Sequence, residues 1–219
     1  MVGPRIVETV EGIQDEEIVK MFDDLKRMLR DRGLLETKEV IKAGVKSGYV
    51  LEVGSGPDYL GLEWLKNTKE TKLTGLEISV NMIKVAQKNT KEYGLESRVR
   101  YVKGDAHRLP FTDNKFDGVF SCESLHEWED PVVVFNEIYR VLKSGGKFFI
   151  GDLRRDINPL VKFLIKIFIR SRDMKEGFLS SIKAAYAPGE INEILKSTDV
   201  KSYKVHTDFM GLSIIGQKI

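Results

Sequence analysis

Apolar residues near the start of the chain recur at helical spacing. They do so through residues 15–33, and Gly33 follows the last of them. This pattern predicts an amphipathic helix that ends at the glycine. A second, shorter helix is expected over 36–46.

From residue 49 the pattern changes to short apolar runs that alternate with helical segments. Strands are expected at 49–53, 73–76, 99–103, 116–121 and 147–151. Helices are expected at 59–68, 80–93 and 131–142, the second with Ser79 as its N-cap and Gly94 at its end. Short continuous apolar runs suit strands that are buried on both faces. The alternation therefore predicts a parallel sheet with helices on both sides.

The alternation stops after residue 152. Residues 157–183 read as helical with no strand between, and a helix over 188–197 precedes two strands near 200–207 and 211–218. Their short connection predicts an antiparallel pair. We expect one α/β domain across 1–219, divided into a helical cap (1–48), a core (49–152), a helical insertion (153–187) and a C-terminal helix with the strand pair (188–219).

Composition narrows the class of protein. The chain has 219 residues, the size of a single domain, and a net charge of +2, which gives no argument for a nucleic-acid partner. Cys122 is the only cysteine, so no internal disulfide is possible, and a cytoplasmic location is expected. The first residues are too acidic and polar for a signal peptide, and no apolar run reaches the roughly 18 residues that span a bilayer. No metal site is expected.

The ends of the predicted strands carry the candidate chemistry, because ligands of open parallel sheets bind beyond the strands' carboxyl ends. The first strand runs into the turn 52–57, whose glycines allow a sharp bend and a close approach to a ligand. It could also be a simple strand-to-helix turn. It is not the dinucleotide fingerprint, since Tyr59 stands where a third glycine is expected.

Acidic residues follow the next two strands. Glu77 can accept hydrogen bonds from both hydroxyls of a ribose, and Asp105 can accept one from the amine of adenine. Taken singly, Glu77 could be a solvated strand end and Asp105 a helix N-cap. Their coincidence with the glycine turn predicts a nucleoside ligand.

Five successive segments carry a family resemblance. They are VLEVGSGP, LTGLEIS, VKGDAHRLPF, FDGVFSCESLHEWEDP and EIYRVLKSGGKFFIGD. In order and spacing they resemble the motifs of class I S-adenosylmethionine-dependent methyltransferases, most of all the small-molecule branch that includes the quinone-biosynthesis methyltransferases. The resemblance covers residues 49–152. It implies a Rossmann-like, doubly wound, seven-stranded sheet whose last strand is antiparallel, with S-adenosyl-L-methionine as cofactor and S-adenosyl-L-homocysteine as product.

The resemblance also implies roles for individual residues. The methionine end of the cofactor would lie against Glu52, Gly54, Ser55, Gly56 and Pro57, with the backbone near Ser121 close to its amino group. Glu77 would hold the ribose, Ile78 and Met82 would pack on the nucleoside, and Asp105 and Ala106 would bind the adenine. One departure is Asp58, which stands where the family often has glycine.

An acceptor pocket is expected beside the cofactor, formed by His126, Trp128, Arg154 and Tyr186. His126 titrates near neutrality and is the candidate general base, although it could instead pack against the cofactor or start a helix turn. Arg154 could bind an anionic group of the acceptor, or it could be a surface charge beside Asp152. His107, next to the adenine site, is expected to be structural, and His206 is given no role.

Residues 160–169 (LVKFLIKIFI) form an apolar segment that is too short to cross a membrane. Such a helix can be a buried lid or core helix, an oligomer contact, or a membrane-surface element. As a lid it would favour a partly apolar acceptor.

The function expected is methyl transfer to a small-molecule acceptor by a monomer or homodimer. Three alternatives stay open. They are a nicotinamide-dependent oxidoreductase, a cofactor-binding subunit or sensor without catalysis, and a methyltransferase for protein or RNA.

Overall fold

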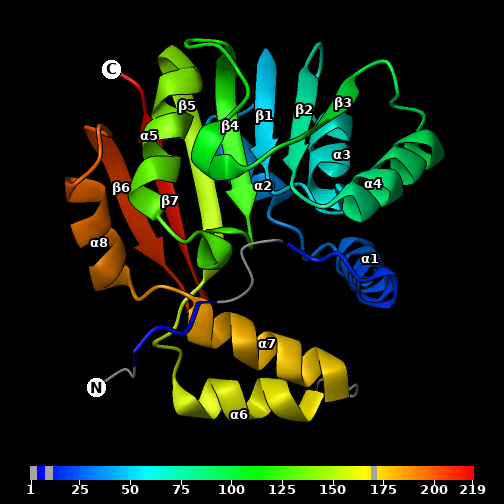
Figure 1. The fold of residues 1–219 in the computed structure, drawn as a ribbon, viewed down its shortest axis with the longest axis vertical. Coiled ribbons are helices and arrows are strands. Elements are labelled where there is room, and N and C mark those ends of the chain that lie inside the picture. Colours follow the sequence, from blue (N-terminus) through cyan, green and yellow to red (C-terminus); the bar gives the residue numbers. More distant parts are fainter. Residues whose placement is uncertain (1–3, 8–11, 169–171) are drawn as a thin grey trace.

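A seven-stranded sheet is the centre of the protein in the computed structural model, which describes residues 4–7, 12–168 and 172–219. The strand order is β3-β2-β1-β4-β5-β7-β6 (Figure 1). The strands are β1 Tyr49–Val53, β2 Lys72–Glu77, β3 Val99–Lys103, β4 Phe116–Cys122, β5 Leu142–Leu153, β6 Ser202–Thr207 and β7 Gly211–Gln217. Only β7 runs against its neighbours, β5 and β6. The predicted doubly wound fold with an antiparallel last strand is confirmed.

Helices cover both faces of this sheet. They are α1 Glu16–Asp31, α2 Thr37–Lys42, α3 Tyr59–Lys66, α4 Val80–Tyr93, α5 Pro131–Val141, α6 Pro159–Phe168, α7 Arg172–Ala184 and α8 Pro188–Lys196. Two short 3-10 turns, η1 Ala106–Arg108 and η2 Leu125–Glu127, follow β3 and β4, and Asp105 is the N-cap of the first, the alternative that the sequence left open for it. None of the described helices is long and apolar enough to pass through a bilayer.

Alternating side chains divide the apolar core between the two faces. Phe149 packs with α2 and α3, whereas its neighbours Phe148 and Ile150 pack in the larger cluster with α5 and α8. Successive side chains of a strand point to opposite faces, so a strand that is apolar throughout serves both clusters.

Strand β5 is longer than the predicted 147–151. It begins at Leu142, directly after α5, and its register against β4 shifts so that 143–146 loop out. Its far end extends to Leu153 because β7 pairs with it as far as Gly211. Pairing partners, which the sequence pattern does not contain, set both ends of this strand.

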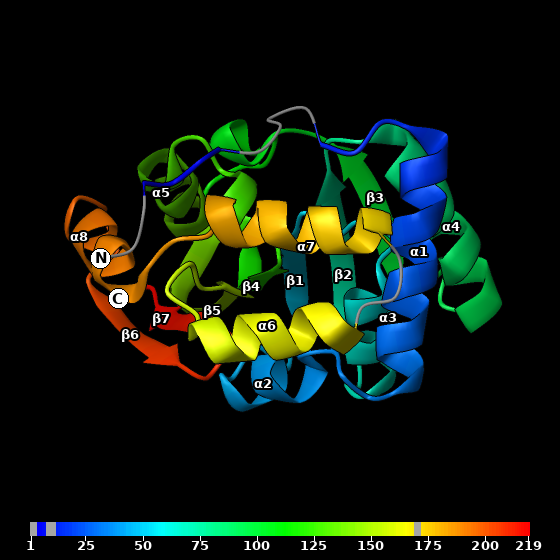
Figure 2. The same ribbon diagram turned by 90° about the horizontal axis from the view of Figure 1, so that it is seen from below.

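The predicted helical stretch 157–183 is two helices, α6 and α7. They cross the end of the molecule where the parallel strands finish, and Figures 1 and 2 both show them side by side, with α6 farther from the sheet. Helix α7 contacts η2. Ile169, the last residue of the predicted apolar segment, lies outside the described residues.

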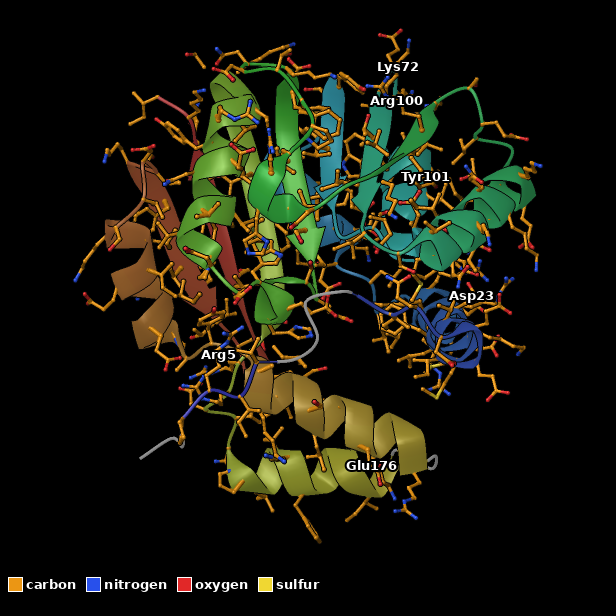
Figure 3. All side chains as sticks on the ribbon, viewed as in Figure 1. Arg5, Asp23, Lys72, Arg100, Tyr101 and Glu176 are labelled. Carbon is orange, nitrogen blue, oxygen red and sulfur yellow. The ribbon has the colours of Figure 1, made fainter. Side chains whose placement is uncertain are left out.

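Arg5 ties the start of the chain to this end of the sheet (labelled in Figure 3). Its guanidinium donates hydrogen bonds to the carbonyl oxygens of Ala184, His126 and Trp128 at 2.6, 2.7 and 3.1 Å. It also lies 4.2 Å from the centre of the Tyr186 ring. One side chain thus links the N-terminal segment to η2 and to the end of α7.

Candidate functional site

One pocket lies where β1, β2, β3 and β4 end. Its lining residues surround about 1060 Å³ of space between atoms, part of which is open solvent. Of the residues predicted to bind the cofactor, those lining it are Glu52, Gly54, Ser55, Gly56, Pro57, Glu77, Ile78, Met82, Asp105 and Ala106. The topology therefore gathers the three strand-end motifs into one site.

The turn after β1 is shaped for a ligand that comes close to the backbone. Gly54 has φ of 70°, and a Cβ placed on it would lie 2.5 Å from Oγ of Ser124. Gly56 has φ of 51°, with Phe22 of α1 facing it across the pocket. Only glycine satisfies both the left-handed conformation and the space available at residue 54.

Glu77 holds this turn against β2. Its Oε2 accepts a hydrogen bond from the Gly56 amide at 2.8 Å, and its Oε1 accepts one from the Ser79 amide at 2.9 Å. Burial raises the pKa of Glu77, and the backbone hydrogen bonds oppose that rise. Each carboxylate oxygen retains a further lone pair, so the carboxylate can still accept hydrogen bonds from ribose hydroxyls.

Asp105 stands at the opposite side of the pocket. Its Oδ1 accepts hydrogen bonds from the amide and from Nδ1 of His107, and Nε2 of the same ring accepts one from the Asp130 amide. Burial raises the pKa of Asp105, but these hydrogen bonds lower it by more. The pKa therefore lies below its usual value, and the carboxylate stays ionised. Its other oxygen accepts no hydrogen bond from the described residues, so it can receive one from an amine. His107 is the structural residue that the sequence predicts.

Residues of the N-terminal segment cover the apolar wall formed by Ile78 and Met82. Gly12 and Ile13 line the pocket, and a Cβ on Gly12 would lie 2.5 Å from the Ile78 side chain. The hydroxyl of Ser79 donates a hydrogen bond to the Ile13 carbonyl oxygen at 2.5 Å. The cap thus contributes directly to the nucleoside side of the pocket.

Asp58 does not narrow the turn, because its side chain points away from the pocket. It has φ of 64° and is fully buried, and its Oδ2 accepts a hydrogen bond from the hydroxyl of Tyr101 (labelled in Figure 3). Its Oδ1 and Oε2 of Glu52 converge over Gly61. Burial and the neighbouring Asp58 raise the pKa of Glu52 well above its usual value, so Glu52 keeps the proton that lies between the two carboxyl groups.

The backbone near Ser121 stays a prediction as the neighbour of the cofactor's amino group, but Ser121 itself is not at the pocket wall. Its side chain is fully buried, its hydroxyl donates to the Val53 carbonyl oxygen at 2.7 Å, and it does not line the pocket. The next three residues, 122–124, line it instead. Strand β4 simply ends one residue later than the predicted 116–121.

Three of the four predicted acceptor residues lie outside this pocket. His126 is 5% exposed and its Nδ1 contacts Oδ1 of Asp152 at 2.8 Å. The guanidinium of Arg154 is paired with Asp156 at 2.6 Å, and the hydroxyl of Tyr186 donates to the Trp128 carbonyl oxygen at 3.2 Å. Trp128 does line the pocket. None of the described residues in 153–187 does so.

Sequence reasoning missed a charged chamber at the end of the pocket nearest α1 and β4. Lys26 is paired with Glu123 at 2.5 Å, and Glu36 and the apolar Phe22 and Leu35 line the same chamber. Although burial opposes the effect, Lys26 lowers the pKa of Glu123. Burial and the charge of Glu123 raise the pKa of Glu36 to about 7. A carboxyl group that titrates near neutrality can take a proton from an N–H or O–H group.

Comparisons with known proteins agree with this geometry. Residues 51–150 match a family model described as a methyltransferase domain. The chain is 34% identical over 113 residues to the methyltransferase GfsG of Streptomyces halstedii, covering 52% of this chain and 39% of that one. It is 28% identical over 110 residues to demethylmenaquinone methyltransferase of Porphyromonas gingivalis, covering 50% and 45%. The chain thus spans about half or less of the length of these curated relatives.

A solved structure extends the likeness to the whole chain. A Methanococcus maripaludis protein assigned as an S-adenosyl-L-methionine-dependent methyltransferase superposes with a TM-score of 0.76 and 27% identity, over 99% of this chain and 97% of that one. The fold and the pocket together indicate the class of protein, which is a Rossmann-like domain that binds a nucleoside. Over residues 51–150 the chain is similar to the class I S-adenosylmethionine-dependent methyltransferases, as the domain model and the solved structure both indicate. The glycine turn, Glu77 and Asp105 fit the cofactor of that family.

Proposed function

We propose that the protein transfers the methyl group of S-adenosylmethionine to a small-molecule acceptor. The observation that carries the proposal is that one continuous pocket joins the cofactor residues to the charged chamber of Phe22, Lys26 and Glu36. The names of relatives add support, since they include an erythromycin 3''-O-methyltransferase from Saccharopolyspora erythraea and a sterol 24-C-methyltransferase from Aspergillus fumigatus. The apolar side chains of the chamber favour a partly apolar acceptor.

The bound cofactor supplies a methyl group that its positively charged sulfur activates. The task of the chain is to hold an acceptor atom in line with that methyl group and to keep water out, and positioning of this kind contributes about 7–11 kcal/mol. Glu77 and Asp105 fix the nucleoside, and the turn 54–57 holds the methionine end. Glu36 is suited to receive a proton that an acceptor loses, a role that the sequence assigned to His126.

Cofactor binding is the first test. S-adenosylhomocysteine at millimolar concentration should raise the melting temperature, because a ligand that binds only the folded state stabilises it by mass action. Reduced nicotinamide dinucleotide at the same concentration should not. A folded protein whose melting temperature does not respond to S-adenosylhomocysteine contradicts the proposal, and a response to the nicotinamide compound alone supports the oxidoreductase.

The acceptor class is the second test. Radiolabelled S-adenosylmethionine is incubated with the protein and a cell extract, which is then separated into small molecules, protein and RNA. We expect the label in the small-molecule fraction. Label in protein or RNA supports a macromolecular methyltransferase, and binding without transfer to any fraction supports a non-catalytic subunit.

A further inference from the structure

Helix α6 presents an apolar stripe to the outside of the molecule. Leu160, Phe163 and Ile167 are 64%, 58% and 59% exposed. Their spacing places them on one face of the helix. None of the three lines the pocket. The stripe therefore has no described partner within the chain, which the lid and core interpretations of this segment both require.

The segment of sequence that contains this stripe is rich in positive charge. Residues 154–184 contain eight Lys or Arg and three Asp or Glu, a net charge of +5, whereas the whole chain carries +2. The rest of the chain is therefore net acidic. The asymmetry gives the protein an electrostatic polarity, with its positive end at α6 and α7.

The position of α6 makes this stripe accessible to a flat surface. In Figure 1 it is the outermost element at its end of the molecule's longest axis, and α7 lies between it and the sheet. An exposed helix of this kind, with Leu and Phe on one side and lysines beside them, suits the boundary between headgroups and acyl chains.

We propose that α6 docks the protein on the surface of an anionic lipid bilayer. Leu160, Phe163 and Ile167 would enter the acyl boundary, and the surrounding Lys and Arg would face the lipid phosphates. A second copy of the chain fits this face less well. A two-fold symmetric contact sets the same patch against itself, so two segments of net positive charge would meet. The proposal is independent of the methyl-transfer activity.

Vesicle co-sedimentation of the full chain tests the proposal. Wild-type protein should sediment with vesicles of equimolar phosphatidylcholine and phosphatidylglycerol, and far less with phosphatidylcholine alone. High salt should weaken binding. Phe163→Asp should weaken it by about tenfold or more, the effect of losing one buried aromatic side chain. Ile167→Asp provides a second variant on the same stripe.

Val133→Asp is the matched control, since Val133 is 38% exposed on α5 rather than on α6. It should bind vesicles like the wild type. Circular dichroism and the thermal response to S-adenosylhomocysteine establish that each variant is folded.

Three results would overturn the proposal. One is the absence of binding to the anionic vesicles at low salt, and another is equal binding to neutral and anionic vesicles. The third is equal binding by wild type, both α6 variants and the control. A wild-type dimer that Phe163→Asp converts to a monomer, without any vesicle binding, would assign the stripe to a second copy instead.

Discussion

The buried carboxyl pair beneath the glycine turn makes the stability of the protein depend on pH. Oδ1 of Asp58 and Oε2 of Glu52 accept no hydrogen bond from the described residues, yet both are buried and approach the same point over Gly61. A proton between them resolves the conflict. In Asp58→Asn, the amide can supply a permanent N–H donor while its oxygen still accepts from Tyr101. Asparagine also tolerates the left-handed backbone at this position.

The size of the effect follows from the pKa of Asp58, which burial raises from 3.8 to about 6. A shift of about two units corresponds to ~3 kcal/mol. Because the pKa is raised in the folded state, this contribution is fully present below the unfolded value and is lost as the pH rises through the folded value. Most of the loss falls between about pH 4 and about pH 7.

Urea unfolding at these two pH values measures the effect. From about pH 4 to about pH 7 the free energy of unfolding of the wild type should fall by about 2–3 kcal/mol more than that of Asp58→Asn. The variant has no carboxyl group to ionise at residue 58. Asp113→Asn, whose side chain is exposed at the surface, should behave like the wild type. If wild type and Asp58→Asn lose the same free energy of unfolding over this range, the raised pKa of Asp58 is refuted.

Other variants separate binding from folding. Gly54→Ala should lose S-adenosylhomocysteine binding by calorimetry, whereas Gly94→Ala, at a similar φ of 65° but with no atom near its Cβ, should lose only about 1 kcal/mol of stability. Glu77→Gln should weaken cofactor binding by roughly 1.5–3 kcal/mol and also destabilise the fold; unchanged affinity would remove Glu77 from the site. Lys26→Met should raise the pKa of Glu123, seen as a carboxyl carbon titrating at higher pH by NMR, and an unchanged titration would refute the pairing.

The residues on the cofactor side of the pocket could be predicted because the topology of the sheet brings them together. Gly54, Glu77 and Asp105 are far apart in sequence, but each follows a strand, and parallel strands end at one edge. The same rule does not predict that Glu77 also stabilises the glycine turn. Both of its carboxylate oxygens accept hydrogen bonds from backbone amides, so the loss of this side chain should affect the turn as well as the ligand.

The acceptor side was less predictable because long-range packing decides it. Phe22 and Lys26 share one face of α1, but a helix pattern does not reveal that this face meets the end of β4. The pairing of Arg154 could have been predicted from the sequence, since Asp156 stands two residues away and forms an ion pair with its guanidinium. The hydroxyl of the buried Tyr186 donates a hydrogen bond to the carbonyl oxygen of Trp128, just after η2, a partner that no local pattern contains.

The hydrogen bonds made by Arg5 affect the order in which parts of the protein can fold. Its acceptors at Ala184 and His126 lie 179 and 121 positions further along the chain. A ribosome makes Arg5 before any of its partners, and the full set of its hydrogen bonds can form only once residue 184 has emerged. The sheet strands β1 to β5 can pair earlier, since all of them precede that residue. Closure of the N-terminal segment over both η2 and α7 is therefore complete only after these five strands have been made, and chains halted before residue 184 should lack the hydrogen bond to the end of α7.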